Sequence, residues 1–212
     1  VILVLLSGSA LAVNWADENI PAIIQGWYPG AQGGRASAEM IFGECSPEGK
    51  LPITFYKTSE ELPEFTDYSM KNRTYRYMTN EALYPFGYGL SYTKFEITDV
   101  NASTDKITDD GIDITCKIKN AGEYFSRETI QVYVKAERKG TPNAQLKGLK
   151  KVALNPGEEK EVTLHLDKKA FALCNEDGVS VVENGEYSIY VGQSQPDLRS
   201  CKLLDKTPIC LK

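Results

Sequence analysis

Carboxylates are the side chains of this chain that most readily suggest chemistry, since a hydrolase can use one as acid/base and a second as nucleophile. The chain has 29 aspartates and glutamates, so close pairs are unavoidable. The adjacent pairs Asp17-Glu18, Glu60-Glu61 and Glu158-Glu159 lie in polar, turn-rich or strand-edge settings. We therefore interpret all three pairs as solvated surface residues.

The only histidine offers little chemistry by its position in the sequence. His165 lies between Leu164 and Leu166, in a run whose apolar residues alternate with polar ones. Because successive side chains of a strand point to opposite faces, His165 is expected to face solvent or an interdomain surface. No cysteine, serine or second histidine is placed beside it, so we predict neither nucleophilic catalysis nor metal binding there.

The cysteines indicate neither a metal site nor a disulfide framework. Their number is odd, they lack CxxC spacing, and no histidine cluster accompanies them. Unpaired thiols are more common in a reducing compartment, which favours a cytoplasmic location. The five residues are Cys45, Cys116, Cys174, Cys201 and Cys210.

Length and composition place the chain among ordinary globular proteins. Its 212 residues suffice for one large or two small domains, and 42% of them are hydrophobic while 25% are charged. The formal net charge of -5 argues against nucleic acid or an anionic membrane as partner, because both select basic surfaces.

Aromatic residues supply the remaining candidate sites. Trp27 and Tyr28 open a glycine-rich turn that leads into a helix, but the turn has neither the GxGxxG pattern nor the Lys-Ser/Thr of a phosphate loop. The glycines are first of all residues that let the backbone turn. The tyrosine-rich segment Tyr75–Tyr92 has no helical or strand periodicity, Arg76 lies within it, and Arg73 shortly precedes it. Arginines that stack on aromatic rings clamp irregular backbone well, so we predict a structural clasp here.

The elements that position these residues fall into two parts. For the first part, residues 1–92, we expect a strand at Val1–Leu6 buried in a parallel sheet, a helix within residues 14–25 that includes Ile20, Ile23 and Ile24, a helix at Arg35–Phe42 and a strand at Leu51–Phe55. This order is typical of part of an open α/β layer. A chain seldom begins inside a buried strand, so we expect this one to be a fragment.

The second part, residues 93–212, has the pattern of an all-β domain. Apolar residues alternate with polar ones in four segments, around Ile114, Val132, Leu164 and Ile189. Turn signals such as Asn155-Pro-Gly157 separate them. Short alternating strands of this kind predict a β-sandwich, and because the Cys…Trp…Cys pattern of immunoglobulin domains is absent, we expect a fibronectin type III-like one.

Three motifs resemble a family signature when taken in order. They are Trp27–Gly34, Gly49–Phe55 and Tyr75–Tyr92, and together they resemble the C-terminal part of a family 3 glycoside hydrolase, a family that includes β-glucosidases and β-xylosidases. The second half adds Asn120-Ala-Gly122 and Leu154–Glu158, which are close to the fibronectin type III-like module of that family. The resemblance covers residues 1 to about 205.

The resemblance implies a parent enzyme that hydrolyses terminal β-linked glucose or xylose with retention, without a cofactor. In such enzymes the nucleophilic aspartate lies in an N-terminal barrel and the acid/base precedes the strand matching Val1–Leu6. This chain would then lack both catalytic residues, brace the α/β domain and be inactive alone. Its partners would be the barrel, the rest of the α/β domain and, through the intact enzyme, an oligosaccharide or β-glycoside. Trp27 and Tyr28 are the candidates for stacking on the sugar.

Two other kinds of protein remain open at this stage. The sandwich could be a stand-alone carbohydrate-binding module, although its aromatic residues are scattered rather than aligned. It could also be an interaction module that acts as a spacer. If the chain is a fragment, the unpaired edge and uncovered apolar faces of its α/β sheet should lead to self-association or limited stability of that half.

Overall fold

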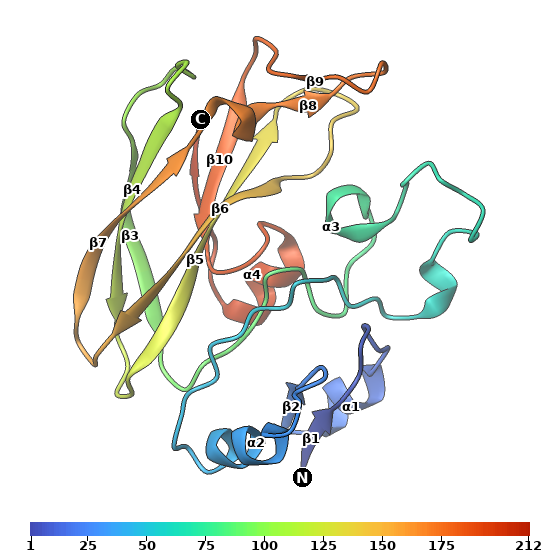
Figure 1. Cartoon of the computed structure of the whole chain (residues 1–212), viewed down its shortest axis with the longest axis vertical. Helices are drawn as coiled ribbons and strands as arrows, with labels where there is room; N and C mark the ends of the chain where they lie inside the picture. Colours follow the sequence, from blue (N-terminus) through green and yellow to red (C-terminus); the bar gives the residue numbers. More distant parts are fainter.

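The chain folds into an α/β part and a β-sandwich that an irregular connector joins (Figure 1). The computed structural model describes residues 1–212. The α/β part contains β1 (Ile2–Leu5), α1 (Asn14–Asn19), β2 (Ala22–Gln25) and α2 (Gly33–Ile41), and β1 pairs with β2 in parallel. The predicted order of an α/β part followed by an all-β sandwich is confirmed. None of the helices is both long enough and apolar enough to span a membrane.

The helix expected within residues 14–25 is wrong in its second half. The helix ends at Asn19, and Ile23 and Ile24 belong to β2. The cause is Pro21, which disfavours helical backbone at the residue before it, and Ile20 is indeed extended, with φ -114° and ψ 126°. Beyond the proline, two β-branched residues continue as strand, for which they have a natural preference.

The strand expected at Leu51–Phe55 is also wrong. Only Phe55 forms a bridge, to Tyr84, while Leu51 exchanges hydrogen bonds with the tyrosine-rich segment, accepting from Gly87 N at 2.7 Å. Pro52 lacks an N–H group and interrupts any ladder. The predicted burial of the first strand on both faces is not seen, because Ile2 is exposed and the rest of β1 is half-buried. The helix predicted at Arg35–Phe42 is present but is shifted to Gly33–Ile41.

The connector runs from residue 56 to residue 94 and contains little regular structure. Its short helical turns are η1 (Ser59–Glu61) and α3 (Thr74–Tyr77), with an outward loop between them (Figure 1). Arg73 fixes that loop by donating hydrogen bonds to the carbonyls of Glu64 at 2.8 Å and Asp67 at 2.9 Å.

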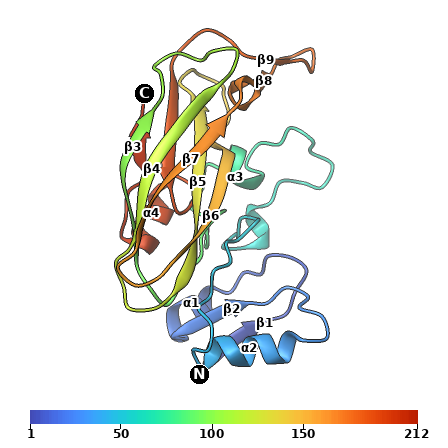
Figure 2. The same ribbon diagram turned by 60° about the vertical axis from the view of Figure 1, so that its left-hand side comes forward.

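The sandwich consists of a three-stranded and a four-stranded sheet packed face to face (Figure 2). Both sheets are antiparallel, and their strand orders are β3-β4-β7 and β11-β10-β5-β6. A small β8-β9 hairpin, the turn η2 and the helix α4 complete this half. The bounds are β3 (Phe95–Ala102), β4 (Ile112–Asn120), β5 (Ser126–Ala136), β6 (Gln145–Leu154), β7 (Glu159–Leu166), η2 (Lys168–Phe171), β8 (Leu173–Cys174), β9 (Ser180–Val181), β10 (Tyr187–Gly192), α4 (Leu198–Leu204) and β11 (Ile209–Leu211).

Alternating residues of both sheets build the core. The inward side chains of β4 alternate with outward ones along the whole strand, and Ile114, Cys116 and Ile118 are completely buried. The opposing sheet contributes Ile130 and Val132 to the same cluster. The period of two seen in the sequence therefore corresponds to one buried face per strand.

The motif Asn120-Ala-Gly122 pins the end of β4. The buried Asn120 side chain donates to the carbonyls of Tyr124 and Leu154 at 2.8 and 3.1 Å, and it accepts from Thr93 Oγ1 at 2.6 Å and Gly122 N at 3.1 Å. A side-chain amide that uses its donors and acceptor in this way is fully satisfied although buried. It ties the connector to two turns of the sandwich.

Candidate functional site

The tyrosine-rich segment, which lies within the connector, is a clasp that joins the α/β part to the sandwich, as predicted. The ring of Tyr75 stacks on Phe86 with centroids 4.1 Å apart and an angle of 8°, and both rings meet the buried Tyr133 of β5 edge-on. Arg76 lies 6.0 Å from the centroid of the Tyr75 ring. Arg73 instead holds the outward loop, so only one of the two arginines contacts the stacked rings.

Gly87 brings the connector backbone directly onto β5. Its φ is 79°, in the left-handed region, and an added Cβ would lie against Gln131 and 2.7 Å from the Tyr133 hydroxyl. The Gln131 amide donates to the carbonyls of Gly87 and Gln193, both at 2.9 Å, and its oxygen accepts from the Tyr133 hydroxyl at 2.6 Å. Burial raises the pKa of Tyr133 far above its ordinary value, which keeps this hydroxyl protonated as a donor.

A buried ion pair lies beside this contact. Lys50 Nζ is 2.8 Å from Glu128 Oε1, and the two side chains are 13% and 5% exposed. Lys50 also donates to the Gly89 carbonyl at 2.9 Å, while Glu128 accepts from Thr129 N and from the Gln193 amide, each at 2.7 Å. A buried pair is tolerated when further hydrogen bonds satisfy both charges, as they do here. This glutamate is therefore occupied by a lysine and is not free for acid/base chemistry.

Asp17 is not the simple surface residue that the sequence suggested. Its carboxylate accepts a hydrogen bond from the Tyr84 hydroxyl at 2.6 Å and meets the Arg199 guanidinium at 3.4 Å. Arg199 further donates to the Leu83 carbonyl at 3.2 Å. The pKa of Tyr84 is raised above its ordinary value, mainly because the ring is buried and secondly because its hydroxyl donates to Asp17. Asp17 thus joins α1 to the connector and to the helix α4 of the sandwich.

The other residues weighed for chemistry occupy ordinary positions. Glu18 and Glu60 are exposed, Glu158 accepts from Asn155 N at 2.8 Å within a turn, and His165 is exposed with Nδ1 2.7 Å from Asp113. No group of three or more histidine, cysteine or acidic side chains is arranged to hold a metal ion. All five cysteines are free thiols, of which Cys116 alone is buried.

Trp27 and Tyr28 follow directly after β2, at the carboxyl end of the parallel strand pair. Trp27 is half-buried with φ 53°, and its ring meets Phe55 edge-on at 6.2 Å. Tyr28 is 80% exposed, and its ring lies over the backbone of Gly8 in the loop after β1. The ends of parallel strands are where ligands bind in open α/β sheets. Of the two candidates, only Tyr28 presents a free ring face.

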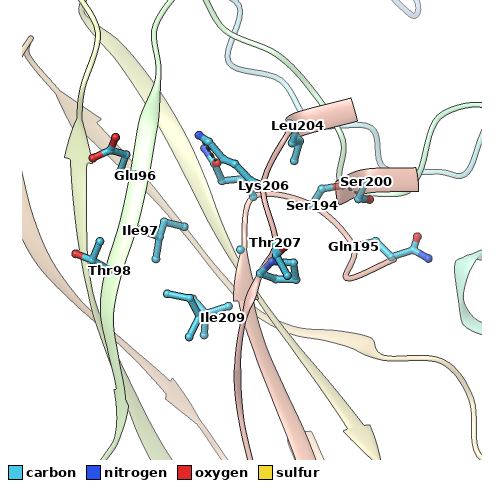
Figure 3. Close-up of a pocket in the computed structure, with 14 residues that line it drawn as sticks. Glu96, Ile97, Thr98, Ser194, Gln195, Ser200, Leu204, Lys206, Thr207 and Ile209 are labelled. Atoms are coloured by element: carbon cyan, nitrogen blue, oxygen red, sulfur yellow. Dashed lines mark hydrogen bonds between the residues drawn. The ribbon is translucent and has the colours of Figure 1, made fainter. Parts of the chain in front are cut away.

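Two hollows lie around the helix α4. The smaller, of about 280 Å³, is lined by β3, β11 and the segment that joins β10 to α4 (Figure 3). In it the Lys206 amine donates to Gln193 Oε1 at 3.1 Å, and burial lowers the pKa of Lys206. The larger, of about 570 Å³, is a groove between the connector and the four-stranded sheet. Neither hollow was foreseen from the sequence.

Comparison with known proteins places the chain in a family. Residues 1–92 match the model described as the glycosyl hydrolase family 3 C-terminal domain, and residues 128–195 match the fibronectin type III-like domain. The xylan 1,4-beta-xylosidase of Xylanibacter ruminicola is 40% identical over 93% of this chain, and the thermostable beta-glucosidase B of Acetivibrio thermocellus is 37% identical over 93% of it. The chain covers 23% and 28% of these two relatives.

Solved structures agree with the sequence matches. Beta-glucosidase 3B from Thermotoga neapolitana, in complex with alpha-D-glucose, superposes on 91% of this chain with a TM-score of 0.83 and 35% identity. The beta-glucosidase of Listeria innocua, in complex with isofagomine, superposes on 99% of it with a TM-score of 0.82 and 29% identity. The chain covers 29% and 30% of these two structures.

The class of protein is thus defined by an α/β domain that continues into a fibronectin type III-like sandwich through a tyrosine-rich clasp. That is the C-terminal arrangement of glycoside hydrolases similar to β-glucosidases and β-xylosidases. The chain belongs to glycosyl hydrolase family 3 and carries its C-terminal domain. It spans about a quarter to a third of the length of the relatives that it matches.

Proposed function

We propose that this chain is the bracing C-terminal part of a retaining exo-β-glycosidase that acts on terminal β-linked glucose or xylose. The names of its relatives, a xylan 1,4-beta-xylosidase and a beta-glucosidase, support the substrate class. The double displacement of such an enzyme needs two carboxylates about 5–5.5 Å apart. The most buried carboxylate here, Glu128, is neutralised by Lys50, which supports placing the catalytic pair in another part of the enzyme.

The observation that carries the bracing role is the continuous set of contacts across the clasp. Tyr84 joins Asp17 to the connector, Gln131 holds Gly87 on β5, and Lys50 pairs with Glu128 of the same strand. The sandwich thereby holds the α/β part from one side. We take residues 1–92 as the C-terminal part of the α/β domain with its connector, and residues 93–212 as the sandwich.

The exposed apolar side chains of the α/β part support a surface that the remainder of the hydrolase covers. Trp15 is 71% exposed and Phe42 is 82% exposed, and β1 has a free edge because β2 is its only neighbour. Large apolar side chains gathered on one part of a protein commonly mark an interface. Produced alone, the chain should self-associate through this part, and sedimentation velocity at increasing concentration would show it. A chain that stays monomeric would count against the proposal.

Tyr28 is the residue of this chain that we propose to contact sugar in the assembled enzyme. Its free ring and its place at the end of the parallel strands suit stacking on a pyranose. The neighbouring Trp27 packs against Phe55 and thereby supports the turn that carries Tyr28.

A chimera tests the proposed function. The chain would replace the matching C-terminal part of the Acetivibrio thermocellus beta-glucosidase B, and turnover of an aryl β-glucoside would be followed. We expect an active chimera, with a Tyr28→Ala version that has a higher KM. A matched Tyr124→Ala version, changed at an exposed tyrosine of the sandwich, should behave like the parent chimera. A chimera that folds and binds no glucoside would contradict the proposal.

A further inference from the structure

The groove between the connector and the sandwich contains polar atoms that the protein itself leaves unsatisfied. Its volume is about 570 Å³, within the range of pockets that hold small molecules. Thr54 Oγ1 and Gln195 Oε1 both lie in its lining and are buried without a hydrogen-bond partner. Thr54 is only 6% exposed. A buried polar group without a partner is unfavourable, so two at one hollow suit the binding of a hydrogen-bonding ligand.

The two atoms come from different parts of the chain. Thr54 lies in the α/β part next to the bridge between Phe55 and Tyr84, and Gln195 lies in the segment between β10 and α4. In Figure 3 the Gln195 side chain points away from Ile97, Ile209 and the rest of the smaller hollow. Gln195 lines both hollows, and the direction of its side chain favours a role in the larger one, which Thr54 also lines.

Other lining side chains add hydrogen-bond acceptors. Asn143 uses its amide protons on the carbonyls of Tyr75 at 3.0 Å and Met78 at 2.9 Å, so its oxygen is what remains for a ligand. Asp197 also lines the groove, and one of its carboxylate oxygens accepts from Ser200 N at 2.6 Å. The amide oxygens of Gln195 and Asn143 therefore offer acceptors to a ligand that carries hydroxyl protons.

The charges of the lining favour a neutral ligand. Among the lining side chains, Glu81 and Asp197 balance Lys135 and Arg199 in formal charge. Glu81 is already paired with Lys57 and Lys202, and Arg199 with Asp17. Lys135 is paired with Glu137, so an anion finds no free cationic side chain here, and the formal charges of the four groups cancel. Met78, Pro196 and Pro208 add apolar surface for the C–H face of a ring.

We propose that this groove binds a neutral polyhydroxyl molecule, a monosaccharide or disaccharide, held by Thr54, Gln195, Asn143 and Asp197. The choice of a pyranose as ligand rests on the proposed function, since the relatives are named for glucosides and xylan. The site would join the two halves of the chain, because the sugar hydroxyls bridge Thr54 of the α/β part and Gln195 of the sandwich. Its occupancy would stabilise the contact between them.

The test measures binding directly on this chain, without any turnover. Glucose, xylose, cellobiose and xylobiose would be titrated into the isotopically labelled protein, and amide shifts followed by NMR. We expect saturable shifts at Thr54, Gln195 and Asn143 with at least one of these sugars. Thr54→Val removes the hydroxyl at nearly constant volume and should weaken affinity about 5- to 10-fold. Its urea midpoint should be equal to that of the parent or higher, because the hydroxyl has no partner in the free protein.

Matched variants distinguish binding in the groove from binding in the smaller hollow or at Tyr28. Thr98→Val, which alters the lining of the smaller hollow, should leave affinity unchanged. Absence of shifts at the highest sugar concentrations that the experiment tolerates would overturn the proposal. So would shifts confined to Tyr28, or a crystal structure that shows water alone on Thr54 and Gln195 in the presence of glucose. The chimera experiment would be unaffected by these outcomes, so failure of this site and failure of the proposed function are distinguishable.

Discussion

The buried pair of Lys50 and Glu128 gives the sharpest prediction about what holds the two halves together. Glu128→Gln keeps the size of the side chain and removes its charge, which leaves the ammonium of Lys50 with the Gly89 carbonyl. A matched change exists close by. Glu48→Gln removes the partner of Arg127 and Lys151, which lie 3.2 and 3.4 Å from the Glu48 carboxylate in a partly exposed setting.

The structure sets different magnitudes for the two changes. Removing one partner of a buried ion pair costs about 3–5 kcal/mol, since the remaining charge is left without compensation. We expect the lower end, about 3 kcal/mol, for Glu128→Gln, because the new amide oxygen still accepts from Thr129 N or meets Lys50. Exposed pairs contribute about 0–1 kcal/mol. The Glu48 side chain is 31% exposed, so Glu48→Gln should cost less than about 1 kcal/mol.

Urea unfolding followed by far-ultraviolet circular dichroism measures both free energies of unfolding. A double-mutant cycle with Lys50→Met isolates the coupling between the two charges, which should be the larger part of the loss. Equal destabilisation by Glu128→Gln and Glu48→Gln, or no coupling in the cycle, would refute the idea that the buried pair fastens the segment around Lys50 to β5.

Three further predictions concern other groups of the chain. Gly87→Ala should lower the free energy of unfolding by about 2–4 kcal/mol in the same urea experiment, because the new Cβ meets Gln131 and Tyr133 and the φ of 79° is strained for alanine. An unchanged urea midpoint would contradict the close approach of Gly87 to β5. Alkylation at pH 8 followed by peptide mass spectrometry should label Cys45, Cys174 and Cys210 in the native chain and spare Cys116, since burial raises the Cys116 pKa to about 11; rapid labelling of Cys116 would show that the core opens. Burial also raises the pKa of Asp197, so the Asp197 carboxyl stays protonated to higher pH in the folded state than in the unfolded chain. The free energy of unfolding should therefore fall as the pH rises from the pKa of the unfolded state to that of the folded state. Asp197→Asn keeps a good helix N-cap and should lessen this loss between acidic and neutral pH, whereas an identical pH dependence of the urea midpoint would contradict it.

The sandwich could be foreseen from the sequence because its signals are local. Four strands follow from the alternation of apolar residues around Ile114, Val132, Leu164 and Ile189, and each is present. The strand β6 is harder to see, because basic side chains and Gly148 interrupt its pattern. Gly148 sits where the register between β5 and β6 shifts beside Val132.

The contacts of the clasp could not be derived in the same way, because they join residues far apart in the sequence. Nothing local pairs Lys50 with Glu128, or places Asp17 beside Tyr84 and Arg199. Likewise, only the folded structure shows that the Thr54 hydroxyl has no hydrogen-bond partner and lines a groove together with Gln195. The one signal in the sequence was the density of aromatic residues in the segment Tyr75–Tyr92, which indicated close packing without naming its partners.

Turnover by the purified chain tests the central claim most directly. Aryl β-glucoside and aryl β-xyloside would be incubated with the chain at high protein concentration for hours, next to the active chimera as positive control. The account predicts no turnover by the chain alone, because the catalytic carboxylates are proposed to lie in another part of the enzyme. Turnover that copurifies with the chain and disappears when one of its own carboxylates is changed, with Asp17, Glu18, Glu39 and Asp67 tried first, would contradict it.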